Sequence, residues 1–215
     1  MMCVLIFVVR MCTHGGSHKW LLSPKSGALL YVRKDHQQWL CPFRNSTCHL
    51  RSTVVDTMGE DFAQSFVWAG TRDRSAFASM WDALQFRASI GGDAAIMRYN
   101  AELAKWGAQH LSRVWNTTNF ISDEFFTSMS DVVLPSTNAS ALELVFATLV
   151  SDYGMNPSGR GSCANPDAAP GRLPGQAGCH FFRLSAQVYL EKSDIVRFGK
   201  LVLHLLREFD PSFYA

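Results

Sequence analysis

Apolar residues recur at intervals of three and four in four stretches of this chain, and this spacing predicts four helices. The first is expected to begin with a cap at Asp73 or Ser75, and Gly91 and Gly92 are expected to stop it. The second is long and has Asp93 as its cap. A helix of this length either links two domains or belongs to a single core. In the first, Met80, Ala83, Leu84 and Arg87 follow at helical spacing. In the second, the residues that recur at three and four positions are Ile96, Tyr99, Leu103, Trp106, His110, Leu111 and Val114.

The other two predicted helices cover residues 141–153 and the stretch from Ser193 to just before Pro211. Asp194 falls in the first turn of the last helix, where a carboxylate complements the helix dipole. The apolar positions are Leu142, Val145, Phe146 and Leu149 in the third helix, and Phe198, Leu201, Val202, Leu205, Leu206 and Phe209 in the fourth.

Short apolar, β-branched runs predict strands before and between these helices. The expected strands are residues 1–12, 27–32, 130–134 and 181–189. Glycines and polar residues in 13–20 indicate a turn, whereas 36–66 and the Gly- and Pro-rich stretch 155–178 are expected to be loops. The alternation of strands and helices predicts an α/β or α+β architecture, and we take α/β as the expected class.

Composition excludes several classes of function. The 215 residues carry a net charge of only +2 and contain no run of Lys and Arg, so no nucleic-acid partner is expected. The apolar start is shorter than the ~20 residues that cross a bilayer, so we expect no membrane partner and a cytoplasmic location. The six cysteines show no C-x2-C pair, which favours free thiols in a reducing compartment and no metal site.

Lys19 is the first candidate for chemistry. It lies in the predicted turn directly after a predicted buried strand, where a side chain can enter a cleft. A partly desolvated lysine amine there can form a Schiff base with a carbonyl. Spacing alone, however, favours an ordinary solvated lysine.

Three segments in order change that interpretation. Residues 18–21 are His-Lys-Trp-Leu, followed by the Ser-Pro-Lys turn at 23–25 and the apolar strand that ends in Val32 and Arg33. Residues 68–73 are Trp-Ala-Gly-Thr-Arg-Asp, and residues 83–92 continue with Ala-Leu-Gln-Phe-Arg-Ala-Ser-Ile-Gly-Gly. Residues 182–189 are Phe-Arg-Leu-Ser-Ala-Gln-Val-Tyr.

Together these segments resemble the class V aminotransferases, which are fold-type-I enzymes dependent on pyridoxal 5'-phosphate (PLP), and in particular the branch similar to isopenicillin N epimerase. The likeness covers most of residues 15–209. It implies a PLP-dependent enzyme acting on an amino acid, of the epimerase or of the C–S lyase and aminotransferase type. It also implies a homodimer.

The resemblance implies a role for each matched residue. Lys19 would hold PLP as a Schiff base and then shuttle the substrate α-proton. His18 would lie near the cofactor, or be a plain turn histidine. The family often has a polar side chain near the phosphate at the position of Gly16, and Ser17 would take its place. The Gly70 backbone and the Thr71 hydroxyl would reach the phosphate of the partner subunit's PLP, or simply begin a helix.

Arg183 would bind the α-carboxylate of the substrate, since a guanidinium fork matches two carboxylate oxygens. Without the motif, Arg183 is a strand arginine in a surface ion pair. The matched segments also imply a division into residues 1–95, the end of a PLP-binding large domain, and residues 96–215, a small C-terminal α/β domain.

Only eighteen residues precede Lys19, whereas about half the chain precedes this lysine in the family. We therefore expect the C-terminal half of such an enzyme, without the family's phosphate-binding helix and pyridine-pairing Asp. Ser26 and Ala69 also depart from the family motifs. Two alternatives stay open: a cysteine desulfurase or selenocysteine lyase with Cys163 as nucleophile, and a fragment without catalysis.

Overall fold

The structure is a computed structural model that describes residues 12–25, 27–39, 62–63, 71, 73–119, 123–157, 159–162, 179–211 and 213. The chain divides into two compact units, Met1–Asp93 and Ala94–Ala215. The sequence predicted a division between residues 95 and 96, two positions after the division between the two compact units. What each unit would be in a larger enzyme stays a prediction.

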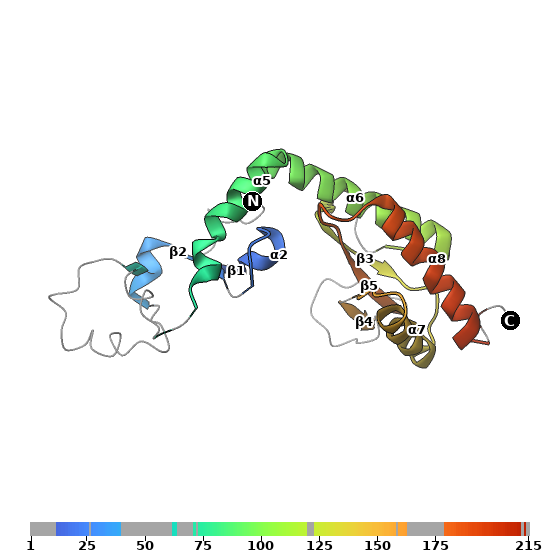
Figure 1. The fold of residues 1–215 in the computed structure, drawn as a ribbon. Helices are drawn as coiled ribbons and strands as arrows, with labels where there is room; N and C mark the ends of the chain where they lie inside the picture. Colours follow the sequence, from blue (N-terminus) through green and yellow to red (C-terminus); the bar gives the residue numbers. More distant parts are fainter. Residues whose placement is uncertain are drawn as a thin grey trace. The chain divides into compact units, whose positions relative to one another are not determined.

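In the described part of the first unit, two strands pair with each other and helices accompany them (Figure 1). Strands β1 (Cys12–Gly16) and β2 (Ala28–Val32) are antiparallel, and Gly16 pairs with Ala28 at one end of the register. The four-residue helix α2 (Ser17–Trp20) lies between them in the chain. A 3₁₀ helix at Lys34–Trp39 follows β2.

The predicted turn at residues 13–20 is wrong. Residues 13–16 belong to β1, and residues 17–20 form one turn of helix. Glycines at 15 and 16 suggested a break, but pairing with β2 supplies backbone hydrogen bonds that outweigh the low strand propensity of glycine. The expected strand at 1–12 lies outside the described residues except for Cys12, as does most of the expected loop at 36–66.

The predicted first helix is divided in two. Helix α4 (Ser75–Ala78) ends at Ser79, and helix α5 (Met80–Ser89) follows directly. The expected stop is confirmed: Gly91 and Gly92 have φ values of 111° and 77°, which side chains rarely tolerate.

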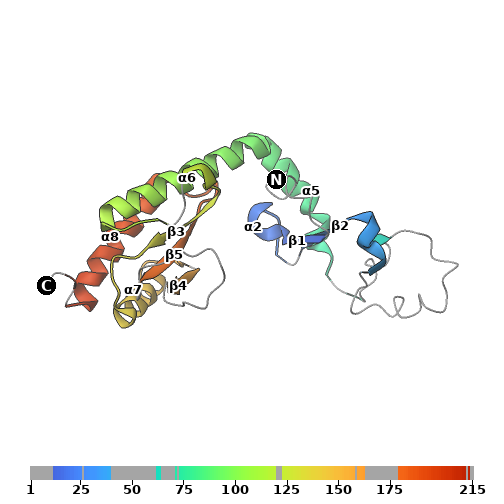
Figure 2. The same ribbon diagram turned by 180° about the vertical axis from the view of Figure 1, so that it is seen from behind.

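The second unit contains a three-stranded antiparallel sheet and helices α6 (Gly92–Trp115), α7 (Ala139–Ser151) and α8 (Lys192–Phe209). Strand β5 (His180–Ser185) lies between β3 (Met129–Val133) and β4 (Arg160–Ser162), as Figure 2 shows from behind. Strand β4 corrects the prediction of an unbroken loop at 155–178. Strand β5 ends at Ser185, four residues before the predicted end of that strand at residue 189. A 3₁₀ turn at Asp123–Phe125 precedes β3.

The core of this unit lies between the helices and one face of the sheet. Phe182 and Leu184 of β5 are buried in it, whereas Arg183 and Ser185 alternate onto the exposed side. Gly107 of α6 allows a close approach, because a Cβ there would lie 2.6 Å from Leu184 Cδ2. Gly199 of α8 does the same for Leu111, whose Cδ2 lies 2.7 Å from the corresponding Cβ position.

The predicted stripe of α7 is confirmed, since all four positions are buried. The stripe of α6 is shifted, because Tyr99 and Val114 are each 40% exposed. Small residues take their place against the sheet and α8, where Gly107 is also buried. The buried positions of α6 are Ile96, Asn100, Leu103, Ala104, Gly107, Ala108, Leu111 and Trp115.

The expected mixture of helices and sheet is confirmed, although both described sheets are antiparallel. The prediction of free thiols is wrong for Cys179, which is buried and disulfide-bonded. The side chains of the other five cysteines lie outside those that the structure describes. The sequence pattern does not show which cysteines fold close together.

Candidate functional site

Lys19 and His18 both lie on helix α2, and both side chains are exposed. The four-residue helix directly follows β1, so the polypeptide changes from extended to helical one residue before His18. Gly16 leaves room for the His18 ring, since a Cβ at Gly16 would lie 3.0 Å from His18 Cε1. The predicted lysine is therefore accessible and has the histidine beside it in sequence.

Ser17, the first residue of α2, has the opposite environment. Its side chain is 1% exposed, and its hydroxyl makes no hydrogen bond within the described residues. Gly27 packs against it, because a Cβ on Gly27 would lie 2.7 Å from Ser17 Oγ. The Ser17 backbone is well held: its N–H donates to Gly27 O at 3.1 Å, and its carbonyl accepts from Leu21 N at 3.2 Å.

Arg87 of α5 binds the last residue of α2. Its side chain is 4% exposed, and Nη1 donates to the carbonyl oxygen of Trp20 at 2.6 Å. Nε donates to Asp93 Oδ1 at 2.8 Å, which neutralises the buried charge. The sequence placed Arg87 in an apolar helical stripe, and a charged residue in such a stripe was the available signal for a buried ion pair.

The second predicted cofactor segment is described only in part. Gly70 lies outside the described residues, and Thr71 is exposed. Two residues later, Asp73 accepts the backbone N–H of Ser75 at 2.8 Å and its hydroxyl at 3.0 Å. These two hydrogen bonds, chiefly the backbone one, lower the pKa of Asp73 below its usual value.

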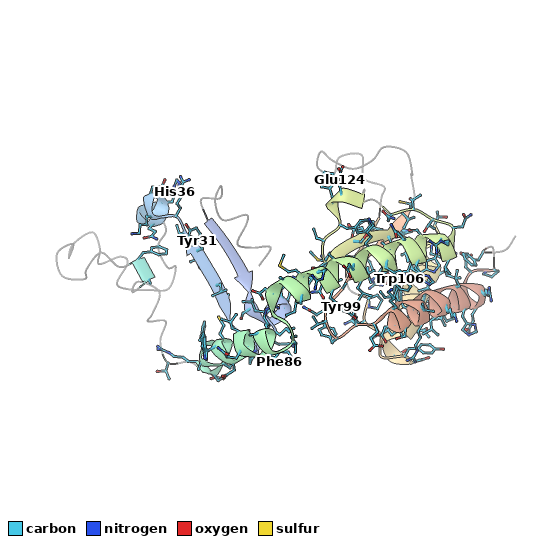
Figure 3. The ribbon with its side chains drawn as sticks, turned by 90° about the horizontal axis from the view of Figure 1, so that it is seen from above. Tyr31, His36, Phe86, Tyr99, Trp106 and Glu124 are labelled. Atoms are coloured by element: carbon cyan, nitrogen blue, oxygen red, sulfur yellow. The ribbon has the colours of Figure 1, made fainter. Side chains whose placement is uncertain are left out.

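A second acidic group of this unit is also perturbed. Arg33, directly after β2, donates to Asp35 through Nε and Nη2, each at 2.6 Å. This hydrogen bonding is the main cause of the lowered pKa of Asp35 and the raised pKa of Arg33. His36 Nε2 lies 2.9 Å from Arg33 Nη2, in the 3₁₀ helix that Figure 3 labels at His36. Arg33 and Asp35 form an exposed ion pair, with His36 beside it.

Arg183 is exposed in the second unit, at the middle of β5. Its backbone N–H donates to Gly159 O at 2.9 Å, and its side chain lies over Gly159. A Cβ at Gly159 would lie 3.2 Å from Arg183 Cζ, so the glycine leaves room for the guanidinium. Asp131 is its register partner on β3, which places both side chains on the same face of the sheet.

The second unit also forms a pocket of about 230 Å³ between α7 and strands β4 and β5. Arg160, Glu143, His180 and apolar residues line it, and Arg183 does not. Cys163 lies outside the described residues. Among the described residues, no three His, Cys, Asp or Glu side chains are grouped to hold a metal ion. No helix of the described part is long and apolar enough to cross a membrane.

Curated proteins from three organisms are similar to this chain. Over 192 residues, or 86% of the chain, it is 28% identical to the hercynylcysteine sulfoxide lyase of Schizosaccharomyces pombe. Over 114 residues, or 46% of the chain, it is 31% identical to the L-cysteine desulfhydrase-like protein lolT2 of Epichloe uncinata. It is also 31% identical over 119 residues, or 55% of the chain, to a probable chloroplastic L-cysteine desulfhydrase of Arabidopsis thaliana.

These matches cover only part of each relative. They span 43% of the Schizosaccharomyces pombe protein and 25% and 24% of the other two. The chain thus spans less than half the length of the curated relatives it matches. No family model matches the chain. The chain is therefore similar to proteins named as a lyase and as cysteine desulfhydrases.

Proposed function

We propose that this chain belongs to a PLP-dependent C–S lyase that acts on a cysteine-derived amino acid. The observation that carries the proposal is the similarity over 86% of the chain to a protein named as a sulfoxide lyase. Two further relatives are named as cysteine desulfhydrases, so all three names refer to cysteine derivatives or to cleavage of them. Lyase chemistry is therefore preferred to the epimerase and aminotransferase types.

The residues of the first unit fit covalent attachment of an aldehyde cofactor. Lys19 is an exposed residue, and exposed His18 is its neighbour in the chain. The buried Ser17 hydroxyl, without a hydrogen bond in the described part, is a further polar group beside them. When bound, PLP would supply an electron sink for negative charge at the substrate α-carbon.

In this proposal the chain's own groups do the remaining work. The Lys19 amine removes the α-proton and returns a proton later, as a general base and acid. Thr71 and the Gly70 backbone bind the cofactor phosphate within a homodimer. Arg183 binds the substrate carboxylate through its guanidinium fork, which matches the two carboxylate oxygens.

The test begins with a PLP titration of the purified 215-residue chain, followed by borohydride reduction and peptide mapping. We expect a visible absorption band, reduction of the cofactor onto Lys19, and loss of both in Lys19→Ala. Lys25→Ala is the matched control, since Lys25 is an exposed lysine close by in the chain. Absence of label on Lys19 would contradict the proposed role of this residue in the chain as it stands.

Activity is then measured with L-cysteine and with an S-alkyl-L-cysteine sulfoxide. Cleavage of the Cβ–S bond releases the sulfur fragment together with pyruvate and ammonia, so pyruvate is the common readout. Lys19→Ala is expected to lower its formation by about 10³-fold or more, because one group serves both attachment and proton transfer. A Cys163→Ser variant with unchanged activity separates this lyase from the desulfurase alternative, which needs that thiol.

A further inference from the structure

We propose that Arg87 is a positioning residue for Lys19, acting through the carbonyl group of Trp20. This inference rests on the proposed function, because it concerns the orientation of the lysine that would hold the cofactor. Its basis is a contact between residues 67 positions apart in the chain, from α5 to the end of α2.

The helix that carries Lys19 is too short to hold its own geometry. A single helical turn is unstable alone, because nucleation restricts several residues for one hydrogen bond. Ser17 O accepts Leu21 N at 3.2 Å and Ser23 N at 3.4 Å, which closes the N-terminal side of the turn. The carbonyl group of Trp20, at the C-terminal end, has no hydrogen-bond partner within so short a helix.

Arg87 supplies such a partner. Nη1 lies 2.6 Å from Trp20 O, and a charged donor makes a stronger hydrogen bond than a neutral one. The bond fixes the peptide plane that follows Trp20, one residue beyond Lys19. The guanidinium cation also suits the negative end of the peptide dipoles of α2.

The burial of Arg87 indicates that this contact is specific. The residue is 3% exposed, although large apolar neighbours on α5 stay exposed, including Trp81 at 65% and Phe86 at 52%. Phe86 is labelled on this helix in Figure 3. Burying a guanidinium is costly unless it is paired, and Asp93 accepts Nε at 2.8 Å to pair it. The Arg87 fork thus joins one carboxylate and one carbonyl, which a lysine cannot do with the same geometry.

The experiment uses the full 215-residue chain, with PLP as the probe and borohydride to trap the product. Label on Lys19 is compared with label on Lys25 and on Lys200 of α8 as internal references. Arg87→Met should lower the rate of Lys19 labelling by about tenfold or more, because small misplacements strongly reduce such rates. Labels on Lys25 and Lys200 should stay within about twofold of wild type. Arg87→Lys should give an intermediate rate, and Arg74→Met, which removes an exposed arginine of the same unit, should match wild type.

Hydrogen exchange at Leu21 and Ser23 is measured on the same variants, without cofactor. Arg87→Met should speed exchange of both amides by about tenfold, which corresponds to a loss of about 1.4 kcal/mol in the stability of the turn. Equal Lys19 labelling in Arg87→Met and Arg74→Met would overturn the inference. If Arg87→Met unfolds the first unit, Arg87→Lys decides in its place, and wild-type labelling and exchange in that variant would overturn the inference.

The two proposals fail in different ways. If wild-type Lys19 takes no more label than Lys25, the proposed function fails for this chain. The exchange data then decide the inference: faster exchange at Leu21 and Ser23 in Arg87→Met supports positioning of the turn, and unchanged exchange overturns it.

Discussion

The two units of this chain differ in how much of their apolar surface they bury. In the second unit, residues from α6, α7, α8, β3 and β5 share one core, and Leu111, Leu149 and Leu206 are fully buried in it. In the first unit, Leu29, Leu30 and Tyr31 of β2 are 51%, 42% and 44% exposed. Tyr31 is labelled on β2 in Figure 3. Among the described residues, the unit that carries Lys19 is therefore the one with less core.

The two units are therefore stabilised by different kinds of interaction. A two-stranded sheet is marginally stable by itself, and among the described residues β1 and β2 form such a sheet. The described contacts that hold the Lys19 turn are polar, from Arg87 to Trp20 O and from Ser17 to Gly27 O. The second unit depends instead on apolar packing between helices and sheet, which is cooperative and insensitive to any single hydrogen bond.

The largest expected effect is the difference in stability lost when one apolar side chain is truncated in each unit. Leu206→Ala should lower the free energy of unfolding of the second unit by about 3 kcal/mol, because it opens a cavity at a fully buried site. Leu30→Ala, at a half-exposed site of β2, should cost less than about 1 kcal/mol. Both free energies of unfolding are measured in urea, with hydrogen exchange as the readout for each unit separately. An equally large cost for Leu30→Ala would break the comparison, since it would mean that β2 is covered in solution.

A smaller effect is expected at the start of α7. Asn138 Oδ1 accepts the N–H of Ala141 at 3.2 Å and so caps this 13-residue helix. Asn138→Ala should cost about 1 kcal/mol in the same unfolding assay, whereas Asn138→Asp should retain most of the stability. If Asn138→Ala leaves the unfolding curve unchanged, packing of the apolar stripe alone determines where α7 begins.

The smallest effect concerns the corresponding contact before α4 in the first unit. The pKa of Asp73 is lowered, so its stabilisation is present above its usual pKa of 3.8 and is lost as the pH falls through the lower folded value. An NMR titration should show the Ser75 amide signal shifting only below about pH 4. Asp73→Asn should abolish this titration and change overall stability little. A midpoint at or above 3.8 in the wild type would contradict the lowered pKa.

The sequence predicted the second unit better than the first. The stripe of α7 was correct at all four positions, and Asp194 lies in the first turn of α8, where it takes part in a capping box with Glu191. These signals are local, since helical spacing and caps depend on residues a few positions apart. The shift in α6 arose because large residues were expected to be buried, whereas Gly107 and Ala108 bring the helix close to its neighbours.

The candidate site was predictable only in its residue types. Lys19, His18 and Arg183 came from motif resemblance, and the structure adds that all three side chains are exposed. Their roles stay predictions. Glycines at 15 and 16 suggested a turn instead of a strand end, because local propensity does not include the pairing with β2.

By itself, the sequence predicted the three helices of the second unit and the segments that resemble a PLP enzyme, because these are patterns within short stretches of chain. It did not predict the break between α4 and α5, or that Asp93, expected as a cap, lies in the first turn of α6 and pairs with Arg87. Only the tertiary structure decided that Arg87 reaches Trp20 O, that Gly27 lies against Ser17, and that Gly159 lies under Arg183. Each of these contacts joins residues well separated in the chain. Their closeness depends on how the elements pack, which no local periodicity encodes.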